Sequence, residues 1–232
     1  MKKNIHRAND RGQANYGWLD TKYSFSFANY YNPNRMGFGK IRVLNDDIIA
    51  PGAGFDTHHH DNMEIITIPL EGKLAHQDST GSKEVIGPGQ IQVMSAGHGI
   101  QHSEYNHSST QDLKLFQIWI ETNQPDAQPR HETKTLNLTK NKLNKIVSGE
   151  KNSDSIFIYQ DANIWLGDFD QATPILLPLT ARRAVFIMVI TGSLKIDQET
   201  LNARDAIEIE TTDAIKININ SHTKILIIDT IT

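Results

Sequence analysis

The chain has 232 residues, a formal net charge of -4 and no cysteine. This length allows one large β unit or two domains of about 100 to 120 residues each. The scattered basic residues disfavour nucleic acid as a direct partner. Without cysteine, disulfides, thiolate metal sites and iron–sulfur clusters are excluded, so any metal must be bound by histidine and carboxylate.

The N-terminal stretch MKKNIHRANDRGQ is polar and lacks the apolar segment of a signal peptide. The longest apolar run, AVFIMVI at residues 184–190, is too short to span a membrane. We therefore expect a soluble, cytoplasmic protein with no membrane partner.

Turns rich in glycine and proline recur throughout the first half of the chain and separate short β-rich runs. The predicted strands are Lys40–Leu44, Glu64–Leu70, Gln90–Met94 and Lys114–Glu121. This spacing is typical of an antiparallel sandwich or barrel, and helix signals are nearly absent.

Residues 123–134 are polar and contain two prolines, and a lysine- and asparagine-rich stretch follows them. We interpret this region as the connection between two halves, a domain at 1–133 and another at 134–232. In the second half DAIEIE, KININ and KILIID alternate as half-buried strands do. Residues 64–78 and 184–198 also resemble each other, which indicates either a duplicated β unit or a chance likeness of two hairpins.

Three consecutive histidines stand at residues 58–60. Because side chains alternate along a strand, His58 and His60 would share one face and His59 would point away. Two imidazoles at this spacing can bind one metal ion. By the same parity Glu64 would lie on the ligand face, either as a hydrogen-bond partner of a ligand histidine or as a bystander.

A second pair with the same spacing, His102 and Glu104, occurs about 40 residues downstream. Three neutral imidazoles and one carboxylate would bind one divalent ion and leave room for water, O2 or a substrate oxygen. Fe, Mn, Co, Ni, Cu or Zn would suit these ligands. Triple histidines and H-x-E pairs also occur on protein surfaces without a metal.

The apolar wall of such a site is expected to include Ile66, Ile68, Val93 and Met94. Among the other histidines, His98 is expected in a turn beside the mouth of the site and His107 in a solvated loop. We assign no functional role to the remaining four, which are His6, His76, His131 and His222.

Two long motifs resemble those of a known family. Residues 51–72, PGAGFDTHHHDNMEIITIPLEG, resemble the first cupin motif, and residues 87–106, GPGQIQVMSAGHGIQHSEYN, resemble the second motif as it occurs in pirins and bacterial pirin-like quercetin 2,3-dioxygenases. Residues 11–47 are similar to the N-terminal signature of the same family. The resemblance covers roughly residues 7–133.

The resemblance to pirins implies an all-β bicupin, with two jelly-roll barrels and one metal in the N-terminal barrel, for which Fe(II) is the first candidate. The family's four ligands fall on His58, His60, His102 and Glu104, and Glu104 is also the candidate catalytic base. Bacterial members resemble dioxygenases that open the central ring of a flavonol such as quercetin with O2.

This chain departs from the family pattern in two places. His59 replaces a proline that is common in the family, and the second half has Arg182 and Arg183 where a metal barrel would carry H-x-H. Guanidinium groups cannot bind metal at neutral pH, so we expect that barrel to lack a metal.

Two other functions remain open from the sequence. One is a non-catalytic, redox-sensing metalloprotein that binds a protein partner, because eukaryotic relatives are described as nuclear cofactors. The other is an isomerase that uses the metal as a Lewis acid and needs no oxygen.

Overall fold

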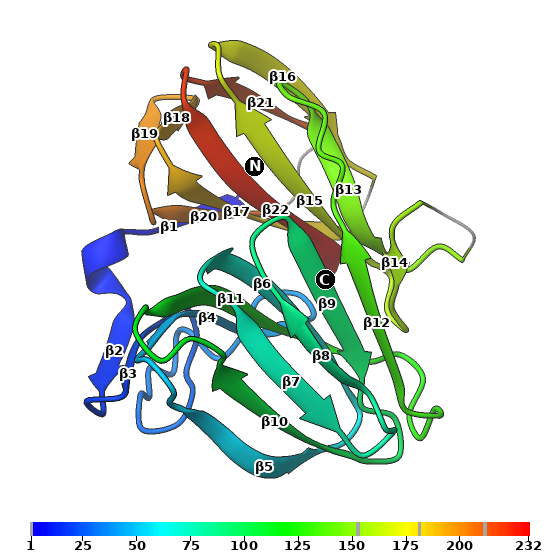
Figure 1. Cartoon of the computed structure of the whole chain (residues 1–232). Helices are drawn as coiled ribbons and strands as arrows, with labels where there is room; N and C mark the ends of the chain where they lie inside the picture. Colours follow the sequence, from blue (N-terminus) through cyan, green and yellow to red (C-terminus); the bar gives the residue numbers. More distant parts are fainter. Residues whose placement is uncertain (1, 152–153, 181, 211–212) are drawn as a thin grey trace.

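The computed structural model describes residues 2–151, 154–180, 182–210 and 213–232. This part of the chain forms 22 β-strands and one 3-10 helix, η1 (Ala8–Asp10), with no α-helix. The strands make four sheets, two of seven strands and two of four (Figure 1). No helix in the described residues is long and apolar enough to cross a membrane.

The first half consists of a seven-stranded sheet and a four-stranded sheet. In spatial order the larger sheet contains β12 (Arg130–Thr135), β9 (Gln90–Ser95), β6 (Met63–Glu71), β11 (Leu113–Glu121), β4 (Ile41–Ile49), β3 (Leu19–Tyr23) and β2 (Gly12–Asn15). The smaller sheet contains β5 (Gly54–His60), β10 (Ile100–Asn106), β7 (Leu74–Asp78) and β8 (Lys83–Ile86).

The second half has the same two kinds of sheet. Its larger sheet contains β1 (Lys2–His6), β20 (Ala206–Glu210), β17 (Arg183–Thr191), β22 (Thr223–Ile231), β15 (Ala162–Phe169), β13 (Leu143–Ser148) and β14 (Ile156–Phe157). Its smaller sheet contains β16 (Thr173–Pro178), β21 (Ala214–Ile219), β18 (Ser193–Ile196) and β19 (Glu199–Asn202).

The two halves repeat one topology strand for strand. The order β9-β6-β11-β4 recurs as β20-β17-β22-β15, and β5-β10-β7-β8 recurs as β16-β21-β18-β19. The two similar sequence segments, 64–78 and 184–198, fall on β6–β7 and β17–β18, which occupy equivalent places. The likeness therefore reflects a duplicated β unit, and the predicted all-β bicupin architecture of jelly-roll type is confirmed.

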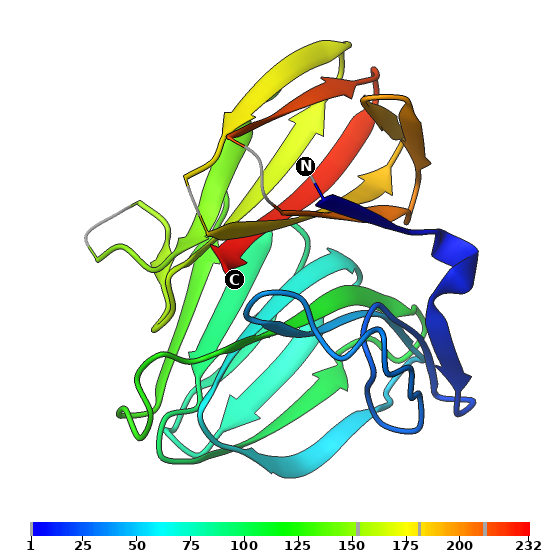
Figure 2. The same cartoon turned by 180° about the vertical axis from the view of Figure 1, so that it is seen from behind.

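Each half completes its large sheet with an edge strand from outside its own repeat. Strand β12 pairs with β9 in the first half, and the N-terminal strand β1 crosses over to pair with β20 in the second half (Figure 2). These strands cover edges that would otherwise be open to pairing with another chain. The division at residue 133 stays a proposal, and residues 2–6 join the sheet of the other half.

A hydrophobic core lies between the two seven-stranded sheets. Ile66, Ile68 and Phe116 of the first half belong to the same buried cluster as Phe186 and Leu226 of the second. Burying side chains of this size stabilises the fold by about 1.5–3 kcal/mol each. The halves thus share a core and are held as one body by apolar contact.

All four strands predicted in the first half exist, and each is longer than predicted or shifted by a residue. The polar region after residue 123 was interpreted only as a connection, but it also contains β12 and leads into β13. Strand β12 is polar because it lies at the edge of its sheet, where none of its residues is fully buried.

Candidate metal centre

Strands β5 and β10 lie side by side in the small sheet of the first half and carry the predicted ligands. Their register places His102 opposite His58 and Ile100 opposite His60. An irregularity between His102 and Glu104 shifts the register there, as a β-bulge does. Three imidazoles from two neighbouring strands are thereby collected on one face of the sheet.

The three imidazoles form a compact group. One ring nitrogen from each of His58, His60 and His102 lies within 4.8 Å of the others. The Nδ1 atom of His58 lies 2.7 Å from the backbone oxygen of Asp56, to which it must donate, so Nε2 keeps its lone pair. That Nε2 atom is 3.0 Å from Nε2 of His102. Two nitrogen ligands of one metal, each about 2.0–2.1 Å from it, lie roughly 3 Å apart.

The electrostatics keep two of these histidines, His60 and His102, neutral. Burial, together with the neighbouring His58, lowers the pKa of His60 to about 4 and that of His102 to about 2. A neutral imidazole has the lone pair that a metal requires. The group therefore fits a divalent ion in geometry, and His60 and His102 have the protonation state that metal binding requires.

Glu104 is buried beside this group, and both its carboxylate oxygens are held. Oε2 accepts a hydrogen bond from Nε2 of Gln117 at 2.9 Å, and Oε1 accepts one from Oγ1 of Thr67 at 3.3 Å. Burial raises the pKa of the carboxyl. An oxygen of Glu104 lies within 4.8 Å of ring nitrogens of His102 and His76, a group that overlaps the first one at His102.

A cavity of about 180 Å³ opens onto His58, His60 and Glu104. Its remaining lining comes from Phe55 of the same strand β5 and from other strands and loops, namely Phe27, Asn45, Asp47, Gln117 and Trp119. The ring of Trp119 packs edge to face on His60, with ring centroids 4.8 Å apart. The cavity therefore combines aromatic walls with a few polar groups, as binding sites for small molecules do.

Two polar groups in the lining lack partners. Oδ1 of Asp47 and Oδ1 of Asn45 are buried and accept no hydrogen bond within the described part of the chain. Burial raises the pKa of Asp47 to about 7. No local sequence signal marks these residues, because the register of β4 against β11 brings them to the cavity.

His59 points away from the imidazole group, as strand parity predicts. Its side chain is 55% exposed, and Nε2 lies 3.6 Å from Oδ2 of Asp61. The ring covers Gly99, where a Cβ atom would come within 2.9 Å of it. His59 is therefore a surface residue on the outer side of β5.

Glu64 does not lie on the ligand face, so of the two alternatives it is the bystander. Glu64 accepts a 2.6 Å hydrogen bond from Ser95, and its neighbours Ile66 and Ile68 pack into the core between the halves. Instead, Thr67 reaches Glu104 inside the barrel. The parity does not carry over from β5 because Asn62, with φ 46°, turns the chain into a different sheet.

The prediction of which residues form the apolar wall was also wrong. Ile66, Ile68 and Val93 belong to the core between the halves, and Met94 packs in a separate cluster with Ile65. None of the four predicted residues lines the cavity. The aromatic wall residues were missed because the register of distant strands places them there.

The other histidines divide into exposed and buried residues. His98, His107 and His222 are exposed, and His98 lies 3.4 Å from Gln128, outside the cavity lining. His76 and His131, to which the sequence assigned no role, stack with ring centroids 4.8 Å apart inside the first half. The sequence carried a signal for His76, because it has the same parity as the buried Leu74 and Asp78.

His6 is also buried, and its Nε2 atom lies 2.9 Å from Glu208 of the second half. This contact holds strand β1 against the neighbouring β20. His6 is therefore structural, as the absence of a spacing signal implies.

The second half has apolar residues at the places equivalent to the ligands. Its strands β16 and β21 correspond to β5 and β10, and they pair Ile175 with Ile217 and Leu177 with Ile215. No group of three or more potential ligands occurs there among the described residues. Arg182 and Arg183 do not mark the equivalent place, because Arg183 begins β17, the counterpart of β6.

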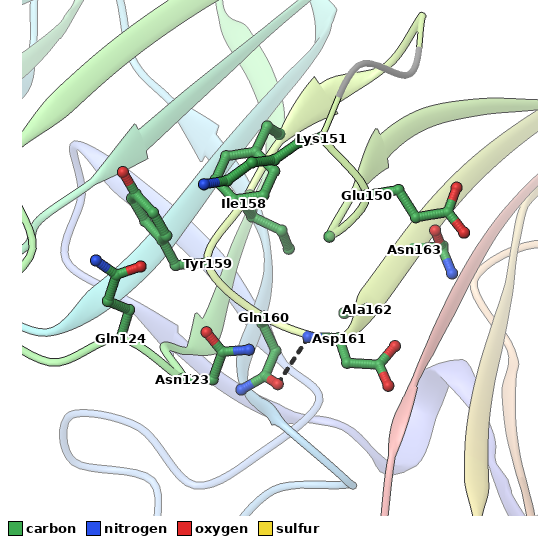
Figure 3. Close-up of a pocket in the computed structure, with 12 residues that line it drawn as sticks. Asn123, Gln124, Glu150, Lys151, Ile158, Tyr159, Gln160, Asp161, Ala162 and Asn163 are labelled. Atoms are coloured by element: carbon green, nitrogen blue, oxygen red, sulfur yellow. Dashed lines mark hydrogen bonds between the residues drawn. The ribbon is translucent and has the colours of Figure 1, made fainter.

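A larger cavity, of about 500 Å³, lies away from the imidazoles and is lined by residues 123–124, 149–151 and 157–163. Figure 3 shows side chains such as Glu150, Lys151 and Asp161 around it, with Gln160 accepting a 2.8 Å hydrogen bond from the backbone N–H of Asp161. Its lining includes no histidine. This cavity lacks the imidazole ligands that make the first one a candidate metal centre.

Comparisons with known proteins agree with the fold and the motifs. The family model described as Pirin matches residues 4–120, and that described as quercetinase C-terminal cupin domain matches residues 145–230. The chain is 41% identical over 225 residues to a quercetin 2,3-dioxygenase of Escherichia coli K12, covering 97% of each chain. It is 35% identical to a putative quercetin 2,3-dioxygenase of Pasteurella multocida, covering 97% of this chain and 98% of the other.

A solved structure described as bacterial pirin YhhW of Escherichia coli in complex with nickel(II) superposes with a TM-score of 0.95 at 40% identity, covering 99% of both chains. Another structure of YhhW gives a TM-score of 0.96 at 40% identity, covering 99% of this chain and 97% of the other. With two family models and full-length relatives in agreement, the chain belongs to the pirin family of bicupins.

Proposed function

We propose that the protein is a metal-dependent dioxygenase that opens the central ring of a flavonol such as quercetin with O2. The observation that supports this most directly is the group of three imidazoles, two of which line an aromatic-walled cavity. The relatives named quercetin 2,3-dioxygenase favour the same reaction.

The proposed ligands of one divalent ion are His58, His60, His102 and Glu104, with Fe(II) as the first candidate. When bound, such an ion supplies a Lewis acid for a substrate oxygen and, if redox-active, access to O2 chemistry. The hydrogen bond from Nδ1 of His58 to the backbone oxygen of Asp56 orients that ring, with Nε2 free to bind the ion.

We assign the proton transfer to Glu104. Because burial raises its pKa, the carboxylate is a stronger base than an exposed glutamate and can accept the proton of a substrate hydroxyl. Gln117 and Thr67 hold the two oxygens in place, so the carboxylate needs little rearrangement before it reacts.

The aromatic residues would hold and shield the substrate. Phe27, Phe55 and Trp119 offer ring faces and edges to a planar aromatic molecule and exclude water from the anion that forms after proton loss. This role is supported by their position in the cavity lining beside His60.

The test combines elemental analysis with oxygen uptake in the presence of quercetin. His102→Ala should lose bound metal and turnover together, and Glu104→Gln should lower turnover by at least about 100-fold. His107→Ala, which changes an exposed histidine, is the matched control and should retain both. Full activity of His102→Ala would refute the proposed ligand set.

The same experiment separates the two alternative functions. Stoichiometric metal without oxygen uptake would favour the redox-sensing protein that acts through a partner. Turnover of a small oxo-compound under anaerobic conditions would favour the isomerase, because the dioxygenase requires O2 as a substrate.

A further inference from the structure

A second group of potential metal ligands lies inside the first half, next to the proposed centre. His76 and Asp78 come from β7, and His131 comes from the edge strand β12. One ligand atom from each lies within 4.8 Å of the others. The imidazole rings of His76 and His131 stack at 19°. Two imidazoles and one carboxylate are thus brought together from two different sheets.

These groups are buried, and part of their polar surface is unpaired. The side chains of His76 and Asp78 have no exposed surface, and that of His131 is 8% exposed. Nδ1 of His76 has no hydrogen-bond partner within the described residues, whereas Nε2 of His131 lies against Glu84. An unpaired buried nitrogen costs roughly 1–3 kcal/mol, and a bound cation would remove such a cost.

Hydrogen bonds fix the orientations of Asp78 and of the neighbouring carboxylate of Glu84. Oδ1 of Asp78 accepts hydrogen bonds from the backbone N–H and the hydroxyl of Thr80, at 2.8 and 2.6 Å. Oδ2 is left facing Nε2 of His76 at 3.0 Å. Glu84 lies 2.9 Å from Nε2 of His131 and accepts a 2.9 Å hydrogen bond from Gln92. Such outer hydrogen bonds orient the ligands of known metal sites.

We propose that His76, Asp78 and His131 form a second divalent-cation site, separate from the centre at His58, His60 and His102. The donor set suits a borderline ion such as Zn²⁺ or Co²⁺, which bind imidazole and carboxylate. The ion joins β7 of the small sheet to β12 of the large sheet, so its role is to tie down the strand that leads toward the second half.

The local charges are compatible with a cation. Two neutral imidazoles and one carboxylate leave a divalent ion with one positive charge, and Glu84 supplies a further negative charge beside His131.

His131 is the discriminating residue, because it belongs to this group alone, whereas His76 also lies within 4.8 Å of His102 and Glu104. The full-length protein is freed of metal with a chelator and titrated with Co²⁺, then with Zn²⁺. Bound metal is counted by elemental analysis and followed by the visible absorption of Co²⁺. Oxygen uptake is not used, so the outcome does not depend on the proposed reaction.

The wild-type chain and the control His107→Ala should each bind two equivalents. His131→Ala should bind one, with the affinity of the remaining site unchanged, and His102→Ala should also retain one. Zn²⁺ should raise the melting temperature less in His131→Ala than in the wild type. One equivalent in the wild type, or two in His131→Ala, would overturn the proposal.

If His131→Ala does not fold, a crystal structure of the wild-type protein tests the second site by itself. Crystals grown with Zn²⁺ should give two anomalous peaks in each chain, one of them between β7 and β12. A single peak at the His58–His60–His102 group would overturn the second site.

Discussion

Replacing Asp47 by asparagine should stabilise the metal-free protein at neutral pH and leave its stability unchanged in acid. Asp47 is 3% exposed, and its Oδ1 atom accepts no hydrogen bond within the described residues. Burial is the main cause that raises its pKa from 3.8 to about 7. The asparagine side chain has nearly the same shape but cannot ionise.

The magnitude follows from linkage. Between pH 3.8 and about 7 the carboxyl of Asp47 is protonated in the folded protein and ionised in the unfolded chain. The stability that Asp47 contributes is therefore fully present below about pH 4 and is lost as pH rises through about 7. A shift of roughly three units at about 1.4 kcal/mol each gives a difference on the order of 4 kcal/mol. The free energy of unfolding of Asp47→Asn should exceed that of the wild type by this amount near pH 8.

Urea unfolding at several pH values, followed by tryptophan fluorescence with chelator present, measures this difference. The two proteins should be equally stable near pH 4 and diverge steadily toward pH 8. Asp112→Asn, which changes an exposed carboxylate, is the matched control and should show no such divergence. Parallel pH profiles for Asp47→Asn and the wild type would refute the reasoning, since they would mean that the carboxylate is paired or hydrated.

Three further substitutions test the fold and the site. Gly97→Ala should destabilise the protein by roughly 2 kcal/mol or more, because a Cβ atom would lie 1.9 Å from the carbonyl oxygen of Ala127 and Gly97 has φ 51°; an unchanged melting temperature would contradict this. Phe186→Ala should cost about 3–5 kcal/mol in urea unfolding by opening the core between the halves, and a loss under 1 kcal/mol would place the shared core in doubt. His59→Ala should leave metal content unchanged, since its ring lies on the outer side of β5; a clear loss of metal would show that the ligand pair is misassigned.

The alternation of side chains along a strand predicted the imidazole group, because each pair of residues lies in one continuous strand. His58 and His60 share β5, and His102 and Glu104 share β10, so the alternation of side chains holds within each pair. The same rule failed for Glu64, because Asn62 changes the direction of the chain and β6 belongs to another sheet. A periodic pattern predicts which side chains share a face only within the strand that carries the pattern.

The cavity wall could not be predicted from local sequence. Phe27, Asn45 and Trp119 meet because β4 pairs with β11 and the loop before β4 folds over them. Register between strands far apart in the chain depends on the packing of the whole sheet, and no single segment records it. His76 is a different case, because its parity with Leu74 and Asp78 was present in the sequence.

The duplicated topology explains why one half can carry polar chemistry inside its barrel. The first half buries Glu104, Thr67 and Gln117 with His102, and each buried polar group costs stability unless it is fully paired. The equivalent strands of the second half fill their barrel with aliphatic residues such as Ile175 and Ile217, so its core favours folding throughout. Because the large sheets share a hydrophobic core, the second half stabilises the first. The second half thus keeps the polar interior of its partner folded, which is a reason for a barrel without ligands to persist beside one that has them.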